Sequence, residues 1–88
     1  MGVEGKVLVR TGDFFLAMLR FEPGGTIHEH PGPQDTFVAC IDGAGWTSVA
    51  GERAQIHAGQ IVRWPKDVPH RLWTEGTEMT TLMLEKLT

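Results

Sequence analysis

The sequence has 88 residues, with 8 lysines and arginines against 11 aspartates and glutamates, and a formal charge of −3. This length predicts a single domain, residues 1–88, and the acidic balance argues against a nucleic-acid-binding protein, which is usually basic. No apolar run approaches the roughly 20 residues of a membrane span, and the start of the chain lacks the apolar core of a secretory signal.

The predicted elements are short strands. Eleven glycines and five prolines separate runs that are rich in β-branched and aromatic residues, a pattern typical of an all-β sandwich or barrel. The Asp42-Gly43 pair predicts a short hairpin turn. The last run also suits a helix, but its threonines and its alternation favour a strand. In chain order, the predicted strands are Lys6–Arg10, Phe14–Phe21, Thr26–His30, Thr36–Ile41, Gly45–Ala50, Arg53–His57, Ile61–Trp64, His70–Thr74 and Thr80–Lys86.

The lone cysteine, Cys40, leaves no partner for an internal disulfide, so we expect a reducing, cytoplasmic location. It lies in an apolar run, which predicts a buried and unreactive thiol. A chain of this size buries only a thin core, and association of two copies would supplement that core. We therefore expect a homodimer.

Three histidines carry the clearest chemical signal. His28 and His30 are two residues apart, so on a regular strand both imidazoles point to the same face and can reach one metal ion. His70, directly after Pro69, completes a three-nitrogen site if its strand packs beside the first. Such a site suits one divalent transition metal, such as Fe, Mn, Ni, Cu or Zn, and leaves open coordination positions. In the alternative interpretation, the pair belongs to an ordinary surface loop. His57, near a turn, is not expected to be a ligand.

Two segments resemble the two sequence motifs of the cupin superfamily. The run Pro23-Gly24-Gly25-Thr26-Ile27-His28-Glu29-His30, followed later by Gly43, is similar to the first motif. Gly59, Pro65 and His70 have the spacing of the second motif. The sequence departs from that motif at Asp67, where the family has Gly, and at Thr74, where it has Asn. The chain thus resembles the small single-domain metal-binding cupins.

This resemblance implies a small jelly-roll, or double-stranded β-helix, barrel with a metal inside it. His28, His30 and His70 match the family's three metal-binding histidines. The family's fourth ligand, a glutamate, has no counterpart here.

The position of the fourth ligand depends on the direction of counting. Counted from His30 it falls on Gln34 or Asp35, and counted back from Gly43 it falls on Thr36. We favour Gln34 over Asp35. The other alternative is that water completes the coordination shell.

Several apolar residues are candidates for the wall of the pocket. Trp64 and Trp73 flank the second motif, and each suits the pocket wall, the core or a dimer interface. The predicted pocket-lining residues are Met18, Val38, Trp64, Leu72 and Met83.

Metal-binding cupins include dioxygenases, isomerases and decarboxylases, so the resemblance implies a metalloenzyme acting on a small oxygenated substrate. Dioxygenase-like chemistry is favoured because it needs few protein acid–base groups, and no catalytic base stands out in the sequence. The alternative is a module that binds or senses a small ligand without catalysis, which suits a chain without long closing loops. A metal-free scaffold is a third possibility.

Overall fold

The computed structural model describes residues 2–88, which form eight strands and no helix. None of these residues belongs to a helix that is long and apolar enough to cross a membrane. In chain order the strands are β1 (Val3–Arg10), β2 (Phe14–Phe21), β3 (Thr26–His30), β4 (Thr36–Val49), β5 (Glu52–His57), β6 (Ile61–Trp64), β7 (His70–Trp73) and β8 (Met79–Lys86).

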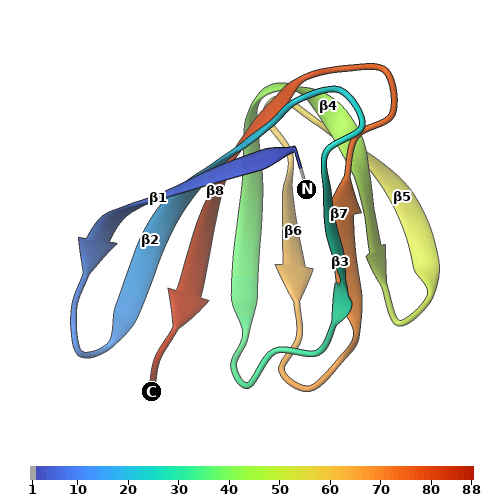
Figure 1. The fold of residues 1–88 in the computed structure, drawn as a ribbon. Coiled ribbons are helices and arrows are strands. Elements are labelled where there is room, and N and C mark those ends of the chain that lie inside the picture. Colours follow the sequence, from blue (N-terminus) through green and yellow to red (C-terminus); the bar gives the residue numbers. More distant parts are fainter. Residues whose placement is uncertain (1) are drawn as a thin grey trace.

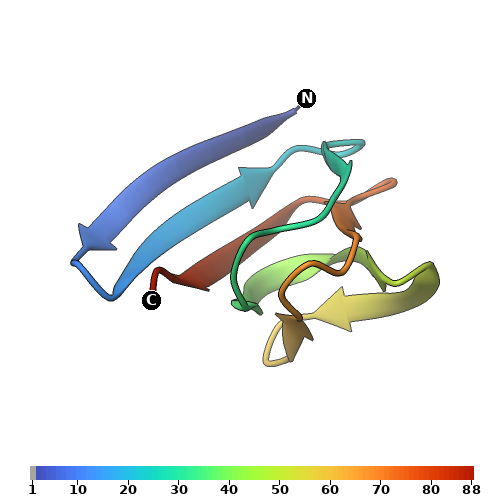
Figure 2. The ribbon, with the colours of Figure 1, turned by 90° about the horizontal axis from the view of Figure 1, so that it is seen from below.

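The strands pair antiparallel in the order β1-β2-β8-β4-β7-β3, and β5 and β6 also pair with β4. The sheet curls into an open half-barrel, as the views in Figure 1 and Figure 2 show. The predicted all-β jelly-roll barrel is therefore confirmed. The last strand, β8, is also confirmed as a strand and lies between β2 and β4.

β4 joins the two sides of the barrel, and here the predicted hairpin is wrong. Asp42 and Gly43 lie inside one continuous strand, Thr36–Val49, rather than between two strands. The first part of β4 pairs with β6 and β8, and its second part pairs with β5 and β7. A register shift next to Asp42 and a φ of 76° at Gly43 mark a β-bulge, which bends the strand from one side to the other. Asp42 and Gly43 thus lie at a bend within one strand and not at a turn that reverses the chain.

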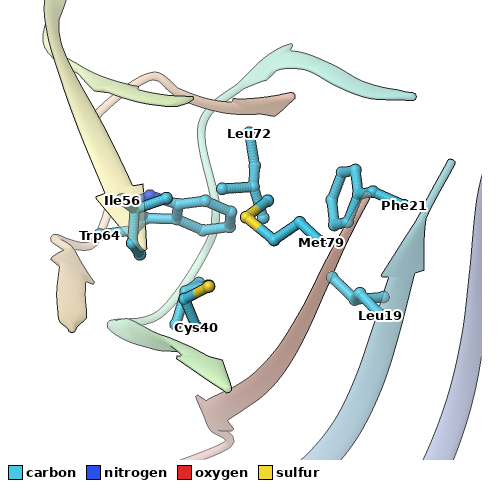
Figure 3. Packing of buried hydrophobic residues seen from close by; sticks show 8 residues of the cluster. Leu19, Phe21, Cys40, Ile56, Trp64, Leu72 and Met79 are labelled. Atoms are coloured by element: carbon cyan, nitrogen blue, oxygen red, sulfur yellow. The ribbon is translucent and has the colours of Figure 1, made fainter. Parts of the chain in front are cut away.

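The hydrophobic core fills the space inside the curl (Figure 3). Phe21, Val38 and Leu72 are fully buried, and each comes from a different strand. Cys40 is buried among them, as predicted, and its Sγ lies 3.5 Å from the carbonyl oxygens of Asp42 and Gly43. Burial raises the pKa of this thiol, which keeps it protonated and unreactive.

Candidate functional site

A cavity of about 280 Å³ lies at the end of the barrel where β3 and β6 end and β4 and β7 begin, the lower end in Figure 1. Its wall is largely apolar, with Ile27, Pro31, Pro33, Trp64 and Met83. Its polar side chains come from four different strands and are His30, Thr36, His70 and Glu85. Two hollows beside β1, of about 380 and 390 Å³, and one beside β5 and β6, of about 310 Å³, are larger, but no histidine lines them. The cavity with the two histidines is therefore the candidate site.

His30 and His70 lie opposite each other on the paired strands β3 and β7. Their ring centroids are 4.6 Å apart, and the rings meet edge to face. The chain thus brings together two imidazoles that are far apart in the sequence. His70 is 2% exposed, whereas His30 is exposed at the rim.

His28 lies outside this lining because β3 is not regular. Ile27 pairs with Leu72 and His30 pairs with His70, so β3 carries one extra residue between these pairs. This bulge changes the side-chain alternation, and Ile27 and His30 both line the cavity. His28 is exposed. The structure therefore brings His30 together with His70 and leaves His28 apart from them.

Hydrogen bonds fix the tautomer of both cavity histidines. Nδ1 of His30 lies 2.9 Å from the carbonyl oxygen of His28, and Nδ1 of His70 lies 3.1 Å from that of Val68. A carbonyl oxygen only accepts, so Nδ1 donates in each ring and Nε2 keeps its lone pair in the neutral form. Burial lowers the pKa of His70, and the neighbouring His30 adds to this, against an opposing contribution from the Val68 hydrogen bond. His70 is thus held as a neutral imidazole, the form that acts as a metal ligand.

Trp64 fixes the plane of the His70 ring. The two rings are stacked with centroids 4.1 Å apart and an angle of 10° between their planes. The indole Nε1 of Trp64 donates to Oγ1 of Thr47 at 3.1 Å, and that hydroxyl donates to the carbonyl oxygen of Arg71 at 2.9 Å. This buried chain of contacts ties β6, β4 and β7 together behind the cavity.

Asp35 closes the turn next to the cavity. Its Oδ1 accepts a hydrogen bond from the backbone nitrogen of Lys66 at 2.8 Å, and its Oδ2 forms a 3.0 Å ion pair with Arg63. These two contacts lower the pKa of the Asp35 carboxyl, the Lys66 hydrogen bond most strongly. Both carboxylate oxygens are thus engaged in joining the β3–β4 segment to the end of β6.

The family model of the cupin domain matches residues 17–85, which is more than half of the chain. The chain belongs to the cupin family. Among proteins of curated function, none matches the sequence. The match covers the whole cavity, from Ile27 to Glu85.

Solved cupin-fold structures superimpose closely on this chain. An RmlC-like cupin from Shewanella frigidimarina has a TM-score of 0.92 at 15% identity, with 99% of this chain and 78% of that chain covered. KdgF from Halomonas sp. has a TM-score of 0.91 at 18% identity, with 99% and 82% covered. The polyketide cyclase RemF from Streptomyces resistomycificus has a TM-score of 0.90 at 15% identity, with 99% and 65% covered. At these identities the likeness establishes the fold alone.

The predicted pocket-lining residues of this cupin divide into three groups. Trp64 and Met83 line the cavity. Val38 and Leu72 are fully buried in the closed core instead, farther inside the barrel. Met18 lies opposite Leu82, the neighbour of Met83, so its side chain points to the other face of the sheet from Met83. It lines a hollow beside β1 instead.

The residues predicted for the fourth ligand have different settings. Gln34 is half-buried in the β3–β4 connection, and Asp35 is engaged by Arg63 and Lys66. Within residues 2–88, no three side chains of His, Cys, Asp or Glu lie close enough together to hold a metal ion. The chemistry of His30 and His70 nevertheless fits two ligands of a transition metal, because the hydrogen bond at Nδ1 of each ring leaves Nε2 as the nitrogen that could bind the metal.

Sequence reasoning missed Glu85, which lines the cavity from β8. One signal for it was present. Met83 was predicted to face the pocket, and Glu85 is two residues further along the same strand, so it shares that face.

Proposed function

We propose that this cupin binds a small oxygenated molecule in the cavity beside His30 and His70, through a divalent transition metal held by the histidines. The observation that carries the proposal is the pair of imidazoles 4.6 Å apart, each with Nδ1 donating to a backbone carbonyl. A hydrogen bond at Nδ1 orients a histidine ring and leaves its Nε2 to bind a metal. An apolar wall beside these polar groups is typical of a small-molecule site.

His30 and His70 would supply two ligands. We propose His28, two residues before His30, as the third, which requires its ring to move toward the other two when the metal binds, because the three rings are not grouped in this structure. Gln34 is proposed as the fourth ligand in preference to Asp35, because both oxygens of Asp35 already have partners. When bound, a divalent metal would act as a Lewis acid or electron carrier toward substrate oxygen. The chain's own groups hold the neutral rings in place and line the cavity with apolar side chains.

The test is the metal content of the protein as purified, by elemental analysis without added metal, followed by titration with Fe(II), Mn(II), Ni(II), Cu(II) and Zn(II). We expect about one metal ion per chain for the site described. Absence of bound metal, together with no uptake in any titration, would contradict the proposal. A bound redox-active metal would favour the dioxygenase-like reaction, which oxygen uptake with candidate substrates then tests.

The second candidate is a ligand-binding or sensing module without catalysis. It is favoured by the wall of the cavity, where Ile27, Trp64 and Met83 give an apolar surface that suits binding alone. Redox-inert zinc at the site, with ligand binding and no turnover, would support this candidate over the metalloenzyme.

We also propose a cytoplasmic homodimer. On the outer face of the curled sheet, Phe37 lies opposite Leu84, and Leu84 lies opposite Leu16. Phe37 and Leu84 are each 38% exposed, and Ile61 is 67% exposed. A second copy would cover these side chains. Sedimentation velocity over a hundredfold dilution tests this, and a monomer mass at every concentration would contradict it.

A further inference from the structure

Glu85 is the one carboxylate among the residues that line the histidine cavity. It comes from β8, on the opposite side of the barrel from β3 and β7, which carry His30 and His70. Its register partner on β4, Thr36, lines the same cavity. Within residues 2–88 the Glu85 side chain makes no ion pair or hydrogen bond. A half-buried carboxylate of this kind has acceptor capacity that a ligand can use.

The charges of the lining residues also bear on which ligands Glu85 can bind. No lysine or arginine is among the residues that line the cavity. Arg63, which approaches from β6, is paired with Asp35 outside the lining. The two histidine rings offer Nε2 lone pairs, which also accept hydrogen bonds. Apart from the Thr36 hydroxyl, which can donate or accept, the polar side chains of the cavity thus offer acceptors, and no lysine or arginine faces them.

We propose that Glu85 is the specificity-determining residue of the cavity and selects ligands that donate hydrogen bonds, neutral or cationic, over anions. The ligand's hydroxyl or ammonium group donates to the Glu85 carboxylate, and its carbon skeleton contacts Trp64 and Met83. In the metal-free protein a ligand carboxylate is disfavoured, because it faces Glu85 with like charge and no lysine or arginine lines the cavity. This inference rests on the cavity being the ligand site proposed above.

Three small molecules of one carbon skeleton test the proposal: 1-aminopropan-2-ol, propane-1,2-diol and lactate. Each is titrated into the chelator-treated, metal-free protein labelled at the methionine methyl groups. The Met83 signal reports on the cavity, and the Met79 signal, from the closed core, reports on the fold. We expect saturable shifts of Met83 with the amino alcohol and the diol, tightest for the amino alcohol, and the weakest binding for lactate.

The decisive variant is Glu85→Gln, which keeps the size of the side chain and removes its charge. Affinity for the amino alcohol should fall about tenfold, while lactate binding should not weaken. Glu52→Gln, at the start of β5 and away from the cavity, is the matched control and should bind all three probes as the wild type does. An unchanged Met79 signal shows that each variant is folded.

Several outcomes overturn the proposal: lactate binding as tightly as the diol, an unchanged affinity in Glu85→Gln, or no saturable Met83 shift with any probe. Metal uptake is measured separately and should be the same in Glu85→Gln as in the wild type. If the wild type takes up no metal but the Glu85-dependent shifts are present, the metal proposal fails and this inference stands. If metal binds and Glu85→Gln changes nothing, the inference fails alone.

Discussion

The indole of Trp64 lies face to face on the imidazole of His70, with ring centroids 4.1 Å apart and their planes inclined by 10°. Trp64 is part of both the hydrophobic core and the cavity wall. It covers one face of the His70 ring and contributes to the burial that lowers the pKa of His70. The position of Trp64 is fixed in turn by the hydroxyl of Thr47.

Thr47→Val tests how much this hydroxyl contributes. Valine has nearly the same shape, but the buried indole N–H of Trp64 loses its acceptor at 3.1 Å. We expect the free energy of unfolding to fall by about 1–3 kcal/mol, the cost of an unpaired buried donor. Urea unfolding at neutral pH measures it. Thr77→Val is the control, because that threonine also donates to a carbonyl but is exposed. Equal losses in the two variants would contradict the prediction.

The sequence was sufficient to predict most of the strands. Turn residues and β-branched runs placed β2, β3 and β6 at the bounds that the structure has. The second motif keeps its spacing although two of its residues differ from those of the family, and the structure accommodates both. Asp67 adopts a φ of 62°, the left-handed conformation that glycine adopts most easily and that aspartate tolerates. Thr74 donates to the carbonyl oxygen of Glu22 and so fastens the β2–β3 connection.

The features near the site that the sequence could not disclose are the bulges in β3 and β4. Strand alternation is a rule of period two, and one extra residue reverses it for every residue that follows. In β3 the bulge places Ile27, not His28, beside His30 in the cavity. In β4 it lets the strand continue through Gly43. A bulge depends on pairing partners that are distant in the sequence, so local patterns carry little information about it.

Gly43→Ala tests the bulge in β4. Gly43 has a φ of 76°, and an added Cβ would collide with the backbone carbonyl of Glu78. Gly51→Ala is the matched control, because its φ of 82° is similarly strained but nothing lies within 4 Å of the added Cβ. We expect Gly51→Ala to cost about 1–2 kcal/mol from the left-handed backbone and Gly43→Ala to cost about 1–3 kcal/mol more from overpacking. Urea unfolding of both variants measures the difference, and equal losses would argue against the close approach.

Asp35→Asn tests the carboxylate that closes the β3–β4 connection onto β6. The Lys66 hydrogen bond and Arg63 lower the pKa of Asp35 in the folded state below its ordinary value of 3.8. A lowered carboxyl pKa adds stability that is fully present above the unfolded-state value and is lost as pH falls through the folded-state value. We therefore expect the thermal midpoint of the wild type to fall more steeply below about pH 4 than that of Asp35→Asn. Asp13→Asn, in the exposed β1–β2 turn, is the control, and its thermal midpoint should fall with decreasing pH as steeply as that of the wild type.

Histidine variants test the proposed metal site one ring at a time. His30→Ala and His70→Ala each remove an oriented ring from the cavity, so the apparent dissociation constant for the bound metal should rise by about tenfold or more. His28→Ala should give a similar loss if that ring supplies the third ligand. His57→Ala, at the exposed end of β5, is the control and should bind metal as the wild type does. Isothermal titration of each variant, folded by circular dichroism, measures the constants. Wild-type affinity in both His30→Ala and His70→Ala would rule out the site, and wild-type affinity in His28→Ala alone would assign the third position to another donor.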